Sequence, residues 1–399
     1  MIRATWKKSI ALLLVLLLIA TPLAACGKGE PEEEAPPVET EAPATPEPPE
    51  PEEEETPELR LPGDIIAGIG RHEVIFELDD MPLLWEEMYH YLQSTRHMLE
   101  QWTVIEDWDA DSGEIDADGE PMTFNELLIH SAITNALQHR AVQRLFYDLD
   151  ETLDEGRYQE AKQDYMEMFE ATEEEFLAML WEGYLTEDVF IYIFSAMEMH
   201  NQAMAAIVGE NGENVPAEAV NAFVEEHEIL RAKHILLSTQ DENRQDLPDD
   251  EIAVISARAL ELYEELAALT GQAQRIRFQE MLDSYGEDPG MLMNPEGYTF
   301  MPHAMVAEFT AGTQELEIDE IGPPVRSGFG YHIILRLPVE EDQFVMLPGG
   351  AQPMPIQGLA GATYVESILE EIKAELQTQY RTTPLFDRIV PGEIFAAAD

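Results

Sequence analysis

Two histidines stand inside apolar segments of the chain, where a polar ring is unusual. His234 interrupts "RAKHILLS" (Arg231–Ser238), and His332 interrupts "FGYHIILRLP" (Phe329–Pro338). Both segments have the short apolar pattern of buried strands. A buried polar group that loses its hydrogen-bond partner costs about 1–3 kcal/mol, so each imidazole needs a polar partner in the core. The pattern occurs twice, which makes these rings the first candidates for chemistry.

The two strands enclose a segment in which helical and extended patterns alternate. After the first strand come a polar loop, two helical stretches, a Gly/Pro-rich stretch with a further strand, a short helix and a closing pair of strands. This order predicts an α+β domain over residues 228–338. The expected elements are a loop at 239–250, helices at 251–268, 273–285 and 305–309, and strands within "PPVRSGFGYHIILRLP".

Helical patterns dominate on both sides of this domain. Residues 63–227 open with a hairpin that turns at Asp79–Asp80, followed by a helix from about Leu84. Thr123 and Glu126 fit a capping box at the start of a longer helix. Residues 339–399 hold one good helix and are too short for a core of their own. We expect this tail to pack onto the N-terminal helices.

The N-terminus predicts export and a lipid anchor. A basic start and an apolar stretch (Ile10–Ala20) lead to "LAAC", the layout of a secretory signal over residues 1–25. The motif resembles the bacterial lipobox, whose cysteine becomes the lipidated first residue. Cys26 is the single cysteine of the chain, so it has no intramolecular disulfide partner. An uncleaved membrane anchor is the alternative, although the stretch is short for a span of about 20 residues.

Residues 26–62 predict an extended acidic tether. The part from Pro31 to Glu58 has nine prolines, twelve glutamates and no basic residue. Such a segment buries little apolar area, and charge repulsion keeps it extended. The 399-residue chain as a whole carries a formal charge of −59. This charge argues against nucleic acid as a partner, since phosphate binding needs a basic surface.

Residues 228–338 resemble the parvulin family of peptidyl-prolyl isomerases, whose fold belongs to the FKBP-like superfold. The resemblance rests on four segments in order: "RAKHILL", "FQEMLDSYGEDP", "GYTFMPHAMVAEF" and "IGPPVRSGFGYHII". It implies catalytic positions and a proline pocket. The catalytic positions are His234, Asp288, Ser327 and His332, and the pocket positions are Phe300, Met305 and Phe309. Asp283 and Glu287 remain alternatives for the acid.

The resemblance further implies that the two histidine strands are neighbours, so that the rings satisfy one another in the core. Rotation about an X–Pro bond faces a resonance barrier of about 18–20 kcal/mol. An apolar cup around the proline lowers it, because leaving water disfavours the charge-separated resonance form. The reaction needs no covalent step, and we expect neither a cofactor nor a metal. Taken alone, the spacing of Met305 and Phe309 also fits simple core packing.

Two departures from the family pattern concern specificity. "LMNPEGYTF" replaces a glycine-rich segment before Phe300, so the loop over the site differs in shape. The loop after the first strand has one basic residue, Arg244, against five acidic ones. Relatives that require a phosphorylated residue before proline use a basic cluster there. The sequence therefore predicts an isomerase that does not need phosphate.

Other candidate sites are weaker. The acidic segment Asp107–Asp118 has spaced carboxylates, but Gly113 stands one place late for an EF-hand turn and the twelfth position lacks a bidentate Glu. A solvated loop is favoured over a calcium site. His90 and His97 are more typical of surface or partly buried helix positions than of metal ligands. No pattern indicates a Ser-His-Asp nucleophile, a phosphate-binding loop or a zinc cluster.

The complete architecture resembles the extracytoplasmic foldases of the PrsA and SurA type, with a parvulin domain inserted in an all-α module like that of SurA and trigger factor. Our first hypothesis is a lipid-anchored isomerase on the outer face of the bacterial cytoplasmic membrane. Its partners would be unfolded or partly folded secreted polypeptides with X–Pro bonds. The alternative is a binding-only chaperone, or holdase, whose parvulin domain is catalytically weak. The oligomeric state is open, with a dimer as one alternative.

Overall fold

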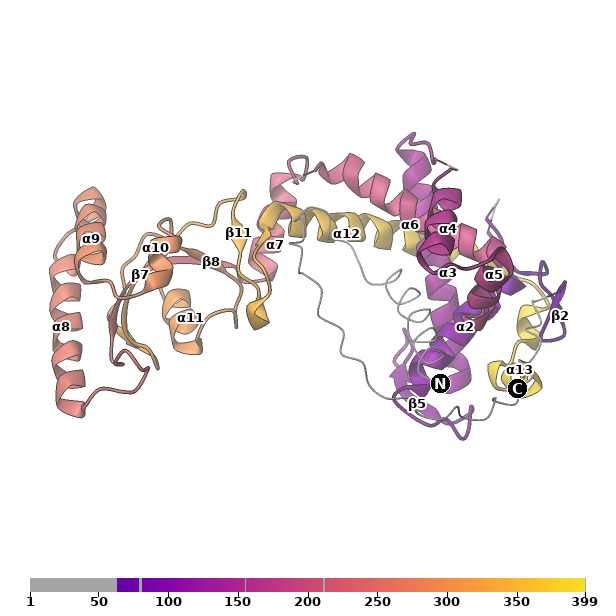
Figure 1. The fold of residues 1–399 in the computed structure, drawn as a ribbon, viewed down its shortest axis with the longest axis horizontal. Coiled ribbons are helices and arrows are strands. Elements are labelled where there is room, and N and C mark those ends of the chain that lie inside the picture. Colours follow the sequence, from indigo (N-terminus) through magenta and orange to yellow (C-terminus); the bar gives the residue numbers. More distant parts are fainter. Residues whose placement is uncertain (1–62, 79–80, 155, 211, 399) are drawn as a thin grey trace, which may run out of the picture. The chain divides into compact units, whose positions relative to one another are not determined.

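A computed structural model describes residues 63–78, 81–154, 156–210 and 212–398 of the chain. The expected signal, Cys26, the tether and the turn at Asp79–Asp80 lie outside these ranges. The described residues divide into two compact units, drawn in Figure 1: unit 1 comprises those up to residue 203 and from residue 369 on, and unit 2 comprises those from 204 to 368. Each unit is described by itself. Within the described ranges, no helix has both the length and the apolar character that a membrane crossing requires.

Unit 2 is built around a four-stranded antiparallel sheet in the order β8-β7-β10-β9. Its strands are β7 (Leu230–Ser238), β8 (Tyr298–Phe300), β9 (Val325–Arg326) and β10 (Gly330–Leu337). Its helices are α7 (Ala217–Glu226), α8 (Asp249–Ala267), α9 (Gly271–Tyr285), α10 (Pro289–Met293) and α11 (Ala307–Gln314). A second small pair, β11 (Phe344–Val345) and β12 (Met354–Pro355), flanks the short helix η1 (Pro348–Gly350).

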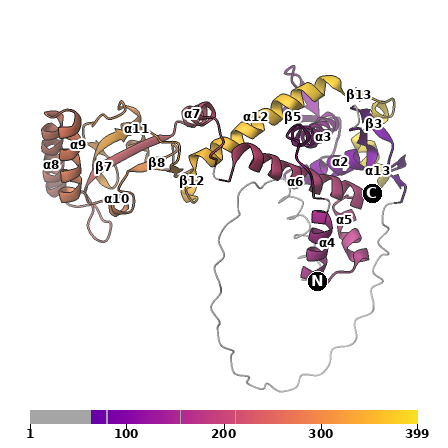
Figure 2. The same cartoon turned by 90° about the horizontal axis from the view of Figure 1, so that it is seen from above.

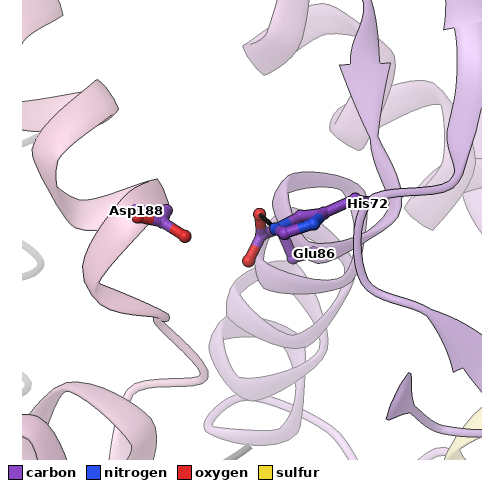
Figure 3. Close-up of side chains that lie close together, drawn as sticks. All are labelled: His72, Glu86 and Asp188. Atoms are coloured by element: carbon purple, nitrogen blue, oxygen red, sulfur yellow. Dashed lines mark ion pairs between the residues drawn. The ribbon is translucent and has the colours of Figure 1, made fainter. Parts of the chain in front are cut away.

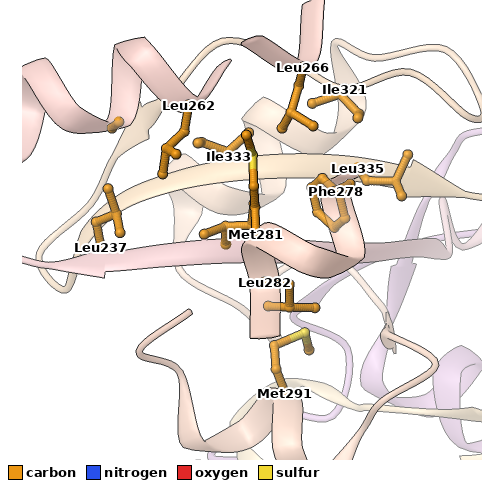
Figure 4. Close-up of a cluster of buried hydrophobic side chains, with 12 residues drawn as sticks. Leu237, Leu262, Leu266, Phe278, Met281, Leu282, Met291, Ile321, Ile333 and Leu335 are labelled. Atoms are coloured by element: carbon orange, nitrogen blue, oxygen red, sulfur yellow. The ribbon is translucent and has the colours of Figure 1, made fainter. Parts of the chain in front are cut away.

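Side chains that alternate along β7 and β10 supply two apolar layers, one on each face of the sheet. On one face, Ile235 and Ile333 pack with residues of α8 and α9, such as Leu262 and Phe278 (Figure 4). On the other face, Ala232 and Ile334 pack against α11 through Phe309. Figures 1 and 2 show α8 and α9 together on one side of this sheet.

Unit 1 is mainly helical, as the amphipathic patterns predicted. Its helices are α2 (Trp85–Glu100), α3 (Phe124–Asp148), α4 (Gly156–Met168), α5 (Glu173–Glu182) and α13 (Pro391–Ala398), with η2 (Phe386–Arg388). Two helices cross the division between the units: α6 (Glu187–Val208) and α12 (Ile356–Gln379). The capping box predicted at Thr123 is present, with its hydroxyl accepting from the Glu126 N–H. A second box joins Thr172 and Glu175.

The small strands of unit 1 join its earlier segment to its C-terminal segment. The strands are β1 (Ile65–Ile66), β2 (Ile69–Gly70), β3 (Val74–Glu77), β4 (Leu83–Leu84), β5 (Asp111–Ile115), β6 (Pro121–Thr123) and β13 (Arg381–Thr382). The antiparallel pairing predicted before α2 is that of β3 with β4. The C-terminal strand β13 pairs with the other edge of β3, and α13 packs on α3.

Two features of the domain around the histidines differ from the expectation. The Gly/Pro-rich stretch holds a helix, α10, before the strand β8, and we expected no helix there. The helix expected at 305–309 begins at Ala307, so Met305 precedes it. His303 has a positive φ of 67°, a turn conformation that delays the start of the helix.

Candidate functional site

The two core histidines meet because of the register between β7 and β10. His234 stands opposite Ile334 and His332 stands opposite Leu236, so the two rings are diagonal neighbours on one face of the sheet. Their Nδ1 atoms lie 2.8 Å apart. Both residues are buried, with 4% and 3% of their surface exposed. Each ring therefore supplies a hydrogen-bond partner that the other needs in the core.

Both outer ring nitrogens are also satisfied. His234 Nε2 lies 2.7 Å from Asp288 Oδ2, and His332 Nε2 lies 2.7 Å from the Ser327 hydroxyl. The four residues expected at catalytic positions thus form one continuous hydrogen-bonded chain. Asp288 is the acid that contacts the histidine, whereas the alternatives Glu287 and Asp283 bond the Ser238 backbone and the Gln279 side chain.

A fifth member of this chain, Tyr298, was not anticipated. Its hydroxyl donates to Asp288 Oδ2 at 2.8 Å, and the N–H of Gly290 donates to Asp288 Oδ1 at 2.9 Å. A Cβ on Gly290 would lie 1.8 Å from the Tyr298 oxygen, so this close approach requires glycine. One signal was available in the sequence. Strand alternation places Tyr298 on the same face as Phe300.

The surroundings fix the charge of two groups in this hydrogen-bonded series, Asp288 and His332. Burial alone would raise the pKa of Asp288, but hydrogen bonds from His234, Tyr298 and Gly290 outweigh burial and lower it to about 2. Burial lowers the pKa of His332 to about 3. At neutral pH the carboxylate is therefore ionised and the His332 ring is neutral. Burial and the bond to Asp288 raise the pKa of Tyr298 above its usual value, so its hydroxyl stays protonated.

The hydrogen bonds fix where the protons lie when both rings are neutral. The carboxylate can only accept, so His234 Nε2 carries a hydrogen and His234 Nδ1 accepts. His332 Nδ1 then donates to His234, and His332 Nε2 accepts from the Ser327 hydroxyl. The donors of this series therefore all point toward Asp288.

The expected proline-pocket residues lie on the same face as the imidazoles. The Phe309 ring meets both rings edge to face, with centroids 5.0 Å from His234 and 5.4 Å from His332. Phe300 packs behind Phe309 at 5.7 Å and is wholly buried. Met305 packs against this cluster but is only partly buried. Among the three, Met305 is the one that solvent reaches most readily.

The loop after β7 lies next to the Ser327 end of the chain of residues. Thr239 N donates to Phe329 O at 3.0 Å, and the Gln240 amide donates to Gly328 O at 2.9 Å. The loop therefore brings its charges close to the site. These charges belong to Asp241, Glu242, Arg244, Asp246, Asp249 and Asp250.

The acidic segment considered for calcium forms a hairpin instead. It contains β5 and the turn into β6, and its carboxylates bond the backbone of their own loop. Asp111 accepts from the Gly113 N–H at 2.9 Å, and Asp116 accepts from the N–H groups of Asp118 and Glu120 at 2.9 Å each. These turn contacts account for the spacing of the carboxylates in the sequence.

One group of described side chains has the composition of a metal site. His72, Glu86 and Asp188 of unit 1 offer ligand atoms that all lie within 4.8 Å of one another (Figure 3). However, Arg71 already occupies the space between them. It donates to Asp188 at 2.8 Å and to His72 Nε2 at 3.1 Å. A cation would have to displace this guanidinium, so the group is an ion-pair cluster.

Comparison with known proteins places the histidine domain in a family. Residues 234–337 match the family model described as "Rotamase: PPIC-type PPIASE domain". The chain is 32% identical over 123 residues to "Foldase protein PrsA 4" of Bacillus cereus, covering 31% of this chain and 37% of that protein. It is 36% identical over 96 residues to "Foldase protein PrsA" of Halalkalibacterium halodurans, covering 24% and 28%. The matched part is thus about a third of each relative's length.

Solved structures of foldases also align with the chain. The structure of peptidylprolyl isomerase PrsA from Bacillus cereus aligns at 18% identity and a TM-score of 0.23, covering 73% of this chain and 93% of that one. PrsA from Bacillus subtilis aligns at 14% identity and a TM-score of 0.22, covering 73% and 94%. The family match and the sequence relatives carry the assignment: residues 234–337 belong to the PPIC-type, or parvulin, family of peptidyl-prolyl cis-trans isomerases, within a chain similar to PrsA foldases.

Proposed function

We propose that this protein is an extracytoplasmic, lipid-anchored peptidyl-prolyl isomerase that helps exported polypeptides to fold. The observation that carries the proposal is the buried chain Ser327–His332–His234–Asp288, which lies against Phe309 inside a PPIC-type domain. Residues 228–338 would provide the isomerase. The helices of 63–227 and 339–399 would form one client-holding module around it.

The apolar side of the site would bind the proline ring. Met305 offers an adaptable, partly exposed wall, and Phe309 offers a buried floor that Phe300 supports from behind. The planar amide is stabilised by a charge-separated resonance form, which gives the bond its barrier of about 18–20 kcal/mol. Moving this amide out of water disfavours that form, and the barrier to rotation falls.

The polar side would act on the carbonyl that turns. Asp288 stays ionised at neutral pH because its pKa is lowered to about 2. A fixed negative charge near the carbonyl oxygen disfavours the partial negative charge that resonance places there. Ser327, His332 and His234 support the carboxylate through successive hydrogen bonds, which hold it in place as the amide twists. No bond is made or broken in this mechanism.

The loop beside the site indicates unphosphorylated substrates. Five carboxylates and one guanidinium, Arg244, follow β7 over residues 238–250. The net negative charge of this loop would repel a phosphate on the residue before the proline. The expected clients are therefore exported chains with ordinary X–Pro bonds, and the strongly acidic surface favours clients that are neutral or basic.

The anchoring part of the proposal rests on the N-terminal sequence. "LAAC" places Cys26 where a lipobox has its modified cysteine, and acyl chains there would hold the protein at the membrane. Replacing Cys26 by serine should release the exported protein from the membrane fraction. Membrane association that survives Cys26→Ser, with the apolar stretch still attached, would instead support an uncleaved anchor.

The isomerase is tested by NMR exchange on two peptides that differ only in phosphorylation of the residue before proline. We expect the intact chain to accelerate exchange in the unphosphorylated peptide and to act more slowly on its phosphorylated partner. Met305→Ala should lower the rate, and Met293→Ala, at an exposed position of α10, serves as the control. A folded parent with no acceleration, which still suppresses client aggregation, would favour the holdase.

A further inference from the structure

Unit 1 contains a cavity that the isomerase mechanism does not use. Its volume is about 290 Å³, at the lower end for ligand pockets. It lies between the start of α2, the middle of α3 and the first turns of α6. The lining residues are Met81, Pro82, Leu84, Glu86, Glu87, Arg140, Gln143, Asp188, Val189 and Tyr192. All of them belong to unit 1.

The guanidinium in the wall is not available to bind an anion. Arg140 is 2% exposed, and each of its five N–H donors has an acceptor in the protein. Nε donates to Met81 O at 2.8 Å, and Nη2 donates to Pro82 O at 2.7 Å. The remaining donors bond both oxygens of Glu87 and the Ala136 carbonyl. A carboxylate or phosphate ligand would find no free donor on this side chain.

The charged groups around the cavity sum to one negative charge. Glu86 is buried at the start of α2, and Asp188 is exposed at the start of α6; Figure 3 shows their carboxylates turned toward one another. Arg71 contacts both, at 3.7 Å and 2.8 Å. Counting Glu87 and Arg140 as well, three carboxylates face two guanidinium groups. The cavity therefore favours a ligand with a positive charge.

The cavity also offers an apolar wall and a free polar atom. Met81, Pro82, Leu84 and Val189 supply the apolar part of the lining. The Tyr192 hydroxyl is buried and has no hydrogen-bond partner among the described residues. Such a group costs about 1–3 kcal/mol unless a ligand or water satisfies it. A ligand with an apolar stem and a polar, cationic end matches all of these features.

We propose that this cavity binds a lysine or arginine side chain of an extended polypeptide. The stem would lie along the apolar wall, and the cationic head would lie beside Asp188, at the carboxylate oxygen that Arg71 does not contact. The volume suits one side chain, so the site would sample single basic residues along a client. The polypeptide origin of the ligand rests on the proposed foldase function, whereas the preference for a cation on an apolar stem rests on the cavity alone.

The test uses the intact chain and two short, proline-free peptides of alanine, leucine and glycine. One has a central lysine, and the other has norleucine, which keeps the stem and removes the charge. Titration calorimetry should show the lysine peptide binding about tenfold more tightly, and added salt should reduce the difference. Asp188→Asn should lower the affinity for the lysine peptide about fivefold and leave that for the norleucine peptide unchanged. Tyr192→Phe should weaken both.

Asp148→Asn is the matched control. Asp148, like Asp188, is an exposed helical aspartate paired with an arginine, here Arg144 at 3.3 Å. Equal weakening by Asp148→Asn would overturn the site in favour of general charge attraction, as would equal binding of both peptides. Binding of free butylamine without binding of the lysine peptide would overturn the polypeptide ligand. Exchange of a short X–Pro peptide, measured in parallel, should not change in Asp188→Asn, which separates this proposal from the isomerase.

Discussion

Each unit of this protein contains a buried polar network, and the two networks are built differently. In unit 2, His234 and His332 join Asp288 to Ser327 through single hydrogen bonds. In unit 1, Arg140 holds Glu87 in a two-pronged ion pair at 2.8 and 2.9 Å. The Tyr91 hydroxyl extends this network to His139. It lies 3.0 Å from Glu87 Oε1 and 2.6 Å from His139 Nδ1.

The difference lies in the freedom of the protons. All N–H donors of Arg140 point to fixed acceptors, so its bonds to Glu87 have one arrangement. Each imidazole nitrogen of unit 2 can donate or accept, depending on whether it carries a proton. A network of the first kind fixes the packing of helices, whereas one of the second kind can respond to a substrate. The predictions below test this distinction, from the largest expected effect to the smallest.

Breaking the fixed network should destabilise unit 1 strongly. Arg140→Met leaves the Glu87 carboxylate buried without its partner and removes donors from three carbonyls. We expect a loss of about 3–5 kcal/mol in the free energy of unfolding. Tryptophan fluorescence in a urea titration measures it, because the tryptophans of the described chain are all in unit 1: Trp85, Trp102, Trp108 and Trp181.

The control for this prediction changes Arg144, which lies one helical turn after Arg140 in α3. Arg144 pairs with Asp148 at the surface, so Arg144→Met should change the free energy of unfolding by less than about 1 kcal/mol. Isomerisation of a short peptide should remain near the parent value in both variants under conditions in which unit 2 stays folded. Similar losses for the two variants would mean that the buried ion pair does not stabilise unit 1.

Both networks should lose stability as the pH falls below neutrality. Burial lowers the pKa of His139 to about 4 and of His332 to about 3, against about 6.5 in an unfolded chain. Above pH 6.5 neither state binds these protons. As the pH falls from 6.5 toward the folded-state values, only the unfolded chain binds them, so stability decreases. The loss at pH 5 is about 2 kcal/mol for each histidine.

Urea titrations at pH 7.5 and pH 5 measure this loss. Fluorescence follows unit 1, and histidine NMR signals follow unit 2. Asp288 does not enter this window, because its lowered pKa contributes stability above its unfolded value of about 4 and loses it only as the pH falls toward 2. Unchanged stability at pH 5 would show that the buried rings accept protons in the folded protein.

A larger side chain at position 290 should disturb the unit 2 network and slow isomerisation without unfolding the domain. An alanine Cβ at position 290 would lie 1.8 Å from the Tyr298 hydroxyl, so Gly290→Ala must displace the tyrosine or α10. We expect an about tenfold lower rate of peptide exchange. Gly328→Ala is the control beside the same site, because a Cβ there meets nothing within 4 Å. Equal exchange rates for Gly290→Ala and Gly328→Ala would mean that the position of Tyr298 does not affect catalysis.

Removing the Tyr298 hydroxyl should have the smallest effect. Tyr298→Phe deletes one donor to Asp288 Oδ2, so the pKa of that carboxyl should rise from its value of about 2. Carboxyl-carbon NMR titration measures the rise. The free energy of unfolding should fall by about 1 kcal/mol. An unchanged Asp288 pKa would mean that the bonds from His234 and Gly290 alone hold the carboxylate.

Much of the fold could be predicted because its signals are local. Apolar periodicity predicted α3 and α9, short apolar runs predicted β7 and β10, and Thr123 with Glu126 predicted a helix start. α10 was missed although Asp288 followed by Pro289 is a helix N-terminus signature, an N-cap with proline at the first position. The glycines and prolines around it suggested a loop instead.

The site required information that no local pattern holds. The meeting of His234 with His332 depends on a strand register set across 98 residues, and we expected it only from the family resemblance. The contact of Tyr298 with Asp288 depends on where α10 places the carboxylate. The ion pair of Arg140 with Glu87 joins two helices, and neither residue differs in the sequence from an ordinary surface charge. Such contacts between distant segments need the fold.

The central claim is that the hydrogen-bonded series Ser327–His332–His234–Asp288 catalyses the isomerisation. One measurement addresses this claim directly. NMR exchange of an unphosphorylated X–Pro peptide should be fast with the intact parent and fall at least about tenfold in Asp288→Ala. Asp283→Ala removes an exposed carboxylate of the neighbouring helix, whose partner is Gln279, and should match the parent. Equal rates for parent and Asp288→Ala, with both proteins folded, would contradict the account.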